Sequence, residues 1–239
     1  MKRFISVPLT LCLALAMAAP ALAQTGPDQW SEPPGVPSNV YYGSGIVATD
    51  SNTLYVAPGN GSNAIYRFTI STSTWTTMAP APLGFTYGGS FTHMPGTNFI
   101  YATRGGLTTT FYRFDFTTGL GTWTVQPVLP FTAYYGTALA ATTTTVYAFQ
   151  GYATQGFWQF NGTTWTAAAS TPVGGTVYLG SALSYPGSGD FIYGLRGYGS
   201  TTFWRYSISG NSWTVLAVVP LPVYYGGCLT WGPAGSLYC

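Results

Sequence analysis

A unit of about 46 residues recurs along the chain, and this repetition constrains the fold more than any other feature. An apolar residue followed by Tyr marks each copy, with steps of 46, 46, 46 and 45 residues between Tyr55, Tyr101, Tyr147, Tyr193 and Tyr238. An aromatic-rich tetrapeptide follows each of the first four copies. A Trp, then a Pro seven residues later, then a Gly close the unit, and these tryptophans are Trp30, Trp75, Trp123, Trp165 and Trp213. Chance does not order four markers in this way, so the chain is built from copies of one supersecondary unit.

Each unit divides into four short segments that are rich in Thr, Tyr, Val, Phe and Trp and are separated by Gly, Pro, Asn and Ser. In the best-defined unit we expect strands over 180–184, 191–195, 203–208 and 212–218. Strands joined by such short turns are antiparallel, because parallel pairing needs a long crossover. Four short strands in a repeat of this length predict a blade of a β-propeller, and therefore an all-β fold.

The glycine doublet of the second unit identifies the type of repeat. Its residues run Tyr101-Ala102-Thr103-Arg104-Gly105-Gly106, with Tyr112 and Trp123 further on. This order resembles the kelch repeat, and the resemblance covers residues 30–239. It implies a kelch-like β-propeller. The doublet is degraded in later units, to Gln150-Gly151-Tyr152 and Arg196-Gly197-Tyr198.

The markers predict four complete four-stranded blades and a fifth blade that is split between the two termini. Trp30 has the place of the outermost strand of that fifth blade, and residues 226–239 supply its first two strands. The third strand has no counterpart in the sequence. Two readings stay open: a propeller truncated after Cys239, which we favour, and a ring that closes imperfectly as it stands.

The amino terminus has the pattern of an export signal. A basic start is followed by an apolar run that is too short for a membrane span and by Ala21-Leu22-Ala23. We therefore expect a signal peptide over 1–23, a propeller over 24–239, and a secreted or periplasmic location. Without the leader the chain holds five Arg against four Asp and one Glu. A protein of about zero net charge lacks the basic surface that nucleic-acid binding needs.

The two cysteines of the last unit suggest a cross-strand disulfide. If 232–235 is a four-residue loop, Trp231 faces Ser236 and Cys228 faces Cys239. Directly opposed residues lie within disulfide range, and an exported protein is in an oxidising compartment. The equivalent predicted pairs are nearly all small: Gly45/Val56, Ser90/Ala102, Ala138/Ala148 and Ala182/Gly194. The alternative is two small buried residues without a bond.

One end of the predicted ring is rich in tyrosine. In an antiparallel blade the loops after strands two and four lie at the same end. These loops carry the candidate ligand-binding residues Tyr42, Tyr87, Tyr135, Tyr178, Tyr225, Arg104, Gln150 and Arg196. Tyrosine offers a flat apolar face with a hydroxyl at its tip, which suits a glycan or a protein surface. The alternative is that these tyrosines only fill the funnel between blades. Arg67, Arg113 and Arg205 recur at one register, which favours a structural role.

Catalytic groups are scarce in this chain. His93 is its only His, which weakens metal, copper-radical oxidase and His-based triad chemistry, and we expect neither a metal nor a cofactor. Asp50, Asp115 and Asp190 stand in turns of different blades, where Asp is common for structural reasons. The leading hypothesis is a non-catalytic module that binds a glycan or protein partner. The alternatives are a kelch-type sugar epimerase or lyase, and a structural surface module of a longer protein.

Overall fold

The computed structural model describes residues 32–232 and 235–239. The predicted leader over 1–23, the start of the propeller domain at residue 24 and the predicted Trp30 strand lie outside the described residues. Within the described residues, no helix is long and apolar enough to cross a membrane.

The chain forms four antiparallel four-stranded sheets, which are numbered here as blades, and one two-stranded sheet. Blade 1 contains β1 (Gly45–Ala48), β2 (Thr53–Ala57), β3 (Tyr66–Thr69) and β4 (Thr74–Thr77), with a 3₁₀ helix, η3 (Ile70–Thr72), before β4. Blade 2 contains β5 (Ser90–His93), β6 (Phe99–Thr103), β7 (Phe111–Asp115) and β8 (Thr122–Val125). Blade 3 contains β9 (Ala138–Ala141), β10 (Val146–Phe149), β11 (Phe157–Phe160) and β12 (Trp165–Ala167). Blade 4 contains β13 (Ala182–Ser184), β14 (Phe191–Leu195), β15 (Phe203–Ser207) and β16 (Ser212–Val215). The half-blade contains β17 (Thr230–Trp231) and β18 (Leu237–Tyr238).

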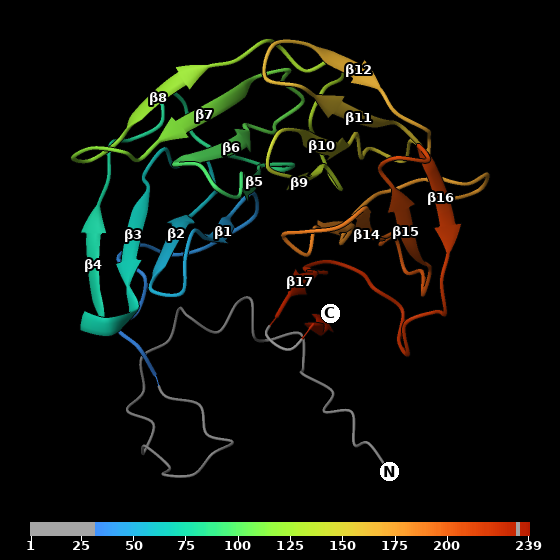
Figure 1. Cartoon of the computed structure of the whole chain (residues 1–239). Coiled ribbons are helices and arrows are strands. Elements are labelled where there is room, and N and C mark those ends of the chain that lie inside the picture. The colour runs from blue at the N-terminus through green and yellow to red at the C-terminus, as the bar shows by residue number, and fades with distance from the viewer. Residues whose placement is uncertain (1–31, 233–234) are drawn as a thin grey trace.

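The blades follow one another along an arc, with the first strand of each blade toward the centre (Figure 1). Neighbouring strands within each blade are consecutive in the chain, as expected for hairpin connections. This arrangement confirms the prediction of an all-β propeller with four complete blades and two strands of a fifth.

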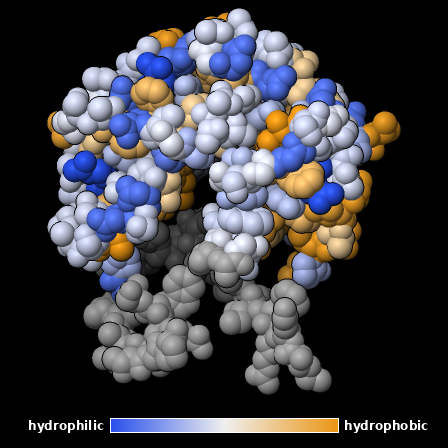
Figure 2. Space-filling model, viewed as in Figure 1, coloured by the Kyte–Doolittle hydropathy of each residue, from blue (hydrophilic) through white to orange (hydrophobic). Residues whose placement is uncertain are grey.

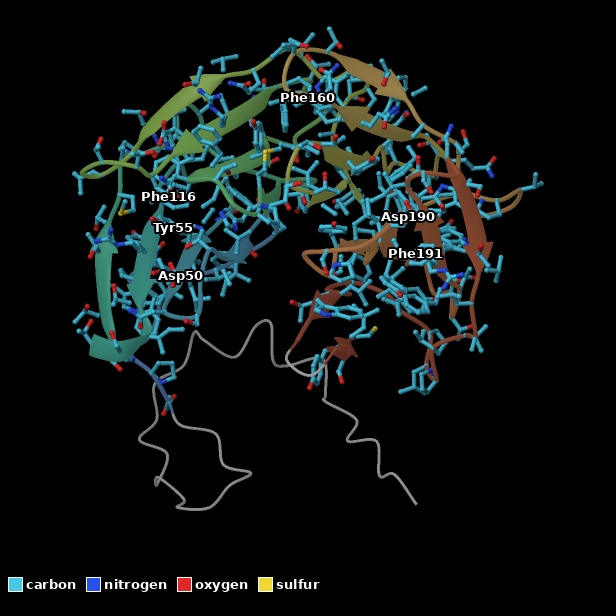
Figure 3. All side chains as sticks on the ribbon, viewed as in Figure 1. Asp50, Tyr55, Phe116, Phe160, Asp190 and Phe191 are labelled. Atoms are coloured by element: carbon cyan, nitrogen blue, oxygen red, sulfur yellow. The ribbon has the colours of Figure 1, made fainter. Side chains whose placement is uncertain are left out.

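The hydrophobic core lies between the blades. Three clusters of buried side chains join blades 1 and 2, blades 2 and 3, and blades 3 and 4. At the first of these interfaces, Tyr55 of blade 1 meets Phe116, which follows β7, with 5.1 Å between ring centroids (Figure 3). The sequence predicted this use of the aromatic residues: each blade buries its apolar face against the next one.

The tryptophan of each outer strand makes a hydrogen bond to the preceding blade. Trp123 Nε1 donates to the carbonyl of Ala79 at 2.9 Å, and Trp213 Nε1 donates to the carbonyl of Ala169 at 2.8 Å. Each acceptor lies four residues after the tryptophan of the earlier blade. Trp75 Nε1 follows the same pattern and donates to the Pro34 carbonyl at 2.8 Å. Pro34 stands four residues after Trp30 in the sequence. We call this bond the Trp latch.

The recurrent arginines lie opposite the recurrent tyrosines. Tyr101 on β6 pairs with Arg113 on β7, and Tyr193 on β14 pairs with Arg205 on β15. The Arg113 guanidinium lies 4.4 Å from the centroid of the Phe99 ring, and Arg205 covers Phe191 at 4.2 Å. The repeated register therefore places a cation over an aromatic face of the same blade, which is a structural role.

The strand register assumed for the cysteine pair is wrong by one residue. Trp231 pairs with Leu237 rather than with Ser236, because pairing continues to Gly232, whose N–H donates to the Ser236 carbonyl at 2.8 Å. This register places Cys239 opposite Leu229, so it does not bring the two cysteines face to face. The same shift occurs in the complete blades, where the observed pairs are Gly45/Ala57, Ser90/Thr103, Ala138/Phe149 and Ala182/Leu195. The Cys228–Cys239 disulfide stays a prediction, but the strand register from which it was predicted is not the observed one.

Candidate binding face

Backbone hydrogen bonds join the two sets of loops that carry the predicted site residues. The connector after strand two of each blade donates an N–H to the carbonyl that precedes strand one of the same blade. The four donor and acceptor pairs are Asn60 to Tyr42, Gly106 to Tyr87, Tyr152 to Tyr135 and Tyr198 to Leu179, at 2.7 to 2.9 Å. The prediction that both sets lie at one end of the ring is therefore correct.

The next residue of each connector bonds to the following blade. Gly61 N–H donates to the Phe85 carbonyl at 2.7 Å, and Leu107 N–H donates to the Ala133 carbonyl at 2.9 Å. Blades 3 and 4 repeat this contact, with Ala153 bonded to Val177 and Gly199 bonded to Val223. Each connector is thus held by its own blade and by the next one, so the backbone of this end is fixed from two sides.

These connectors have an unusual backbone conformation. Three consecutive residues have positive φ in every blade: 59–61, 105–107, 151–153 and 197–199, with values from 55° to 79°. The first of the three is always Gly, while the second is Asn60, Gly106, Tyr152 or Tyr198. Asn and Gly tolerate this left-handed region, whereas a bulky side chain is strained there.

Seven tyrosines on this end form a continuous series of ring contacts, which we call the tyrosine belt: Tyr42, Tyr87, Tyr134, Tyr135, Tyr152, Tyr178 and Tyr198. Tyr42 stacks on Tyr87 with ring centroids 3.7 Å apart, and Tyr87 lies 4.8 Å from Tyr135. Tyr135 meets Tyr178 at 5.7 Å. The structure therefore brings together four of the five tyrosines predicted from the sequence. The fifth, Tyr225, is exposed and lies close enough to Tyr178 to affect its pKa electrostatically.

Tyr152 and Tyr198 are members of the belt that the sequence interpretation missed. Tyr152 meets Tyr134 edge-on at 5.4 Å and 89°, and Tyr198 meets Tyr178 at 5.3 Å and 87°. Their exposed fractions are 50% and 56%. The signal was present as a departure from the repeat, because each tyrosine replaces a residue of the expected glycine doublet.

Three hydroxyls of the belt hold their protons more firmly than free tyrosine does. A side-chain hydrogen bond with Tyr134 is the main cause that raises the pKa of Tyr135, with loss of solvation second. Loss of solvation raises the pKa of Tyr178 and, together with the neighbouring Tyr87, that of Tyr42. At neutral pH these side chains are uncharged hydrogen-bond donors and acceptors.

The predicted polar site residues support the belt loops. Arg104 Nε donates to the Gly84 carbonyl at 3.2 Å, and Arg196 Nε donates to the Thr176 carbonyl at 3.1 Å. Both acceptors precede belt tyrosines in the chain. The side-chain oxygen of Gln150 accepts a hydrogen bond from Trp158 Nε1 at 3.2 Å. Each of the three side chains therefore makes one hydrogen bond within the protein, and ligand binding by Arg104, Gln150 and Arg196 stays a prediction.

The same loops hold most of the large apolar side chains that are exposed. Besides tyrosines, the exposed aliphatic residues of these loops are Leu83, Leu107, Val128, Val173, Val218 and Leu221. Figure 2 shows hydrophobic surface over the connector that follows β16. Where such side chains form a contiguous patch, they mark an interaction surface.

The opposite end of the ring carries the acidic residues in local turns. Asp50 and Asp190 lie before the second strands of blades 1 and 4 (Figure 3). Asp50 accepts from the backbone of Asn52, and Asp115 accepts from Thr117. His93 Nε2 bonds to the Thr97 carbonyl at 2.8 Å, so the only imidazole also belongs to a turn. Among the residues described, no three His, Cys, Asp or Glu side chains gather closely enough to hold a metal ion.

A cavity of about 300 Å³ lies among the innermost strands β1, β5, β9, β13 and β17. Its lining combines aliphatic and aromatic side chains with polar ones, which are Thr92, His93, Ser184, Tyr185 and Thr230. The His93 ring and the Tyr185 hydroxyl are already bonded to the carbonyls of Thr97 and Gly189. A ligand site usually combines an apolar pocket with several convergent polar groups. The cavity is therefore a second candidate site beside the tyrosine belt.

Comparison with known proteins supports the fold and identifies no family. Neither a protein-family model nor a curated protein matches the chain. Among solved structures, the chain is similar to that of YjhT, with a TM-score of 0.64 and 14% sequence identity. The match covers 82% of this chain and 71% of the other. A likeness at this identity shows the propeller-like fold alone.

Proposed function

We propose that this chain is an exported, kelch-like, non-catalytic binding module that recognises a glycan or protein partner through the tyrosine belt. The observation that carries this proposal is the continuous ring contact of seven tyrosines at one end of four blades. Aromatic side chains dominate recognition surfaces because they bury a large area with little loss of rotamer freedom. The basic and apolar leader sequence supports export.

The belt backbone is fixed before any ligand arrives, which favours binding. Each connector bonds to two blades, and Arg104 and Arg196 hold the preceding loops. A surface that is already in its bound conformation loses less entropy on association. The exposed aliphatic residues around the belt enlarge the apolar surface that a partner would cover.

A screen with matched variants tests this function. The wild-type protein, a Tyr152→Gly/Tyr198→Gly double variant and an Asn60→Gly control are applied to a glycan array and to a peptide display library. Glycine is compatible with the positive φ at all three positions, so the variants keep the fold. We expect ligands that bind the wild type and the control and lose at least tenfold affinity for the double variant. Ligands held equally by the double variant, or turnover of a bound sugar, would overturn the proposal.

A further inference from the structure

The Tyr42/Tyr87 pair differs from the other ring contacts of the protein. Its ring centroids are 3.7 Å apart and its planes are 12° from parallel, so the two rings lie face to face. Among the described residues, the next shortest separation is 4.2 Å, between Tyr134 and Tyr135, and those rings are tilted by 58°. Aromatic pairs usually lie about 4.5–7 Å apart, offset or edge-on. A separation of 3.7 Å is close to carbon–carbon contact and leaves little sideways offset between the rings.

The two rings of this pair also point the same way. Loss of solvation raises the pKa of Tyr42, and the charge of Tyr87 and a hydrogen bond with its side chain raise that pKa further. The hydroxyl is the only polar atom of a tyrosine side chain, so this bond places both hydroxyls at the same end of the stack. Because the offset is small, the ring carbons next to the two hydroxyls (the ortho carbons) lie against each other.

Stacked ortho carbons are the arrangement from which two tyrosines form a carbon–carbon bond. One-electron oxidation removes an electron and a proton from each phenol, and the resulting phenoxyl radicals join through their ortho carbons. Each joined carbon then gives up its hydrogen as a proton, and each oxygen takes up a proton. The product is a dityrosine. When a haem peroxidase is the oxidant, the two electrons and two protons released reduce one hydrogen peroxide to two water molecules.

The pair is accessible both from solvent and through the belt. Tyr42 is 42% exposed, so a diffusible oxidant can contact its ring. Tyr87 lies 4.8 Å from Tyr135, and the ring contacts continue to Tyr178 and Tyr198. Aromatic rings in contact exchange electrons, so a radical formed on the exposed Tyr198 has a path to Tyr87.

A covalent bond at this point would join two blades. Tyr42 lies in the segment before β1 and Tyr87 lies in the segment before β5, so the pair connects blades 1 and 2. Blade 1 stands at one end of the arc of blades (Figure 1). A covalent link that closes a long segment of chain restricts the unfolded state and thereby stabilises the fold.

We propose that Tyr42 and Tyr87 form a site of oxidative cross-linking, at which a one-electron oxidant of the haem-peroxidase class converts the stacked pair into a dityrosine that joins blade 1 to blade 2. Because Tyr42 is partly exposed, its ring can turn out of the stack as the product forms. The inference does not depend on the proposed binding function, since it requires no ligand of the belt.

Oxidation of the dilute, purified protein with a haem peroxidase and hydrogen peroxide, followed by tryptic mapping, tests the inference. Trypsin cleaves after arginine, so Tyr42 falls in the peptide that ends at Arg67 and Tyr87 falls in the peptide 68–104. We expect these two peptides to be joined, lighter than their sum by the mass of two hydrogen atoms, together with dityrosine fluorescence. Links from Tyr87 to its other ring neighbours would join 68–104 to 114–196 instead.

Phenylalanine variants provide matched controls. Tyr42→Phe and Tyr87→Phe keep two rings to stack but lack the hydroxyl that is oxidised, and each should lower the yield of the joined peptide at least tenfold. Tyr41→Phe removes an exposed neighbour and should leave the yield unchanged. The oxidised wild type should melt at a higher temperature than the untreated protein, whereas oxidised Tyr42→Phe should not.

A second oxidant keeps the test decisive. Ruthenium tris-bipyridine with persulfate and light supplies a small oxidant that reaches rings from which a large peroxidase is excluded. If neither oxidant forms the joined peptide while free N-acetyltyrosine couples under the same conditions, the inference is overturned. An equal yield of the joined peptide in Tyr42→Phe also overturns it, because the link then comes from another tyrosine of that peptide. Links found only between two protein molecules have the same consequence.

Discussion

The two ends of the ring hold their loops by different kinds of hydrogen bond. At the end with the tyrosine belt, connector N–H groups reach other loops and the next blade, as Gly61 does to Phe85 and Leu107 does to Ala133. At the opposite end several turns are closed by their own side chains, while Leu120 and Asn211 also accept a hydrogen bond from the preceding blade. Asn161 Oδ1, for example, accepts from the backbone N–H groups of both Thr163 and Thr164.

In every blade the belt-end connector is bonded to the next blade, whereas the turns of the opposite end are held mainly by bonds within each turn. Bonds between blades keep side chains of several blades in a fixed relative position, which a shared binding surface needs. Self-contained turns place no such demand on their neighbours. We therefore expect substitutions at the belt end to disturb the whole molecule and equivalent substitutions at the opposite end to remain local.

Replacement of a glycine at the belt end is expected to change the free energy of unfolding more than any other variant considered below. Gly88, in the loop before β5, has φ 85°, and an added Cβ would lie 2.4 Å from the Tyr134 carbonyl oxygen of the next loop. We expect Gly88→Ala to lower the free energy of unfolding by about 3 kcal/mol or more, from backbone strain of roughly 1–2 kcal/mol together with steric overlap. Thermal unfolding followed by circular dichroism measures it.

Gly187, in the turn between β13 and β14, provides the matched control. It has φ 90°, but nothing lies within 4 Å of an added Cβ. Gly187→Ala should therefore cost only the strain of about 1–2 kcal/mol. If both variants lose the same stability, the two ends are equally local and the comparison fails.

Alkaline unfolding gives an intermediate effect. Tyr206 is 1% exposed, and burial, with the charges of Tyr147 and Asp190 next, raises the pKa of its hydroxyl to about 12. Because the pKa of this hydroxyl is higher in the folded state than in the unfolded state, it contributes to the stability of the fold. The contribution is complete at pH values below the pKa of the unfolded state, which is near 10. This contribution is lost as the pH rises through 12, and it amounts to about 2–3 kcal/mol. Urea unfolding between pH 9 and 12 measures the loss.

Tyr206→Phe is the control for this titration, since it removes the ionisable hydroxyl and its hydrogen bond to Asn211. The variant should be less stable at pH 8 and should lose less stability than the wild type between pH 10 and 12. The same decline in both proteins would assign the alkaline step to other groups, such as the belt tyrosines.

Acid titration gives the smallest expected effect. Hydrogen bonds from the Thr117 side chain and backbone hold the pKa of Asp115 below its usual value. A lowered pKa contributes stability that is present above the unfolded value near 4 and is lost as the pH falls below it. The melting temperature should fall slightly from pH 5 to pH 3. Asp115→Asn keeps an acceptor in the turn and should flatten that dependence. An unchanged slope in this variant would contradict the assignment.

The repeat allowed the architecture to be predicted because each unit is a single blade whose strands pair with sequence neighbours. The predicted strand over 191–195 was found as β14, and the shared end of the two loop sets followed from alternating strand direction alone. The register was not predicted correctly. It depends on how many residues form each turn, as at Gly232, where one additional pair shifts every partner in the hairpin.

The candidate site was only partly predicted, for a similar reason. Tyr42 and Tyr87 are recognisable because they recur in register before Gly43 and Gly88. Tyr152 and Tyr198 break the pattern instead of repeating it. Their place in the belt depends on a positive φ at each residue, which sequence spacing does not reveal. Arg104 and Arg196 stay predicted ligand contacts, and sequence spacing could not show that their Nε atoms bond to the carbonyls of Gly84 and Thr176.

The Trp latch gives the molecule a direction of assembly. Each tryptophan donates to the blade that precedes it in the chain, as Trp123 does to Ala79 and Trp213 does to Ala169. A chain emerging from the ribosome would therefore always present the acceptor carbonyl before the tryptophan that needs it. Folding can then proceed blade by blade during synthesis, with each new blade completed against a finished neighbour.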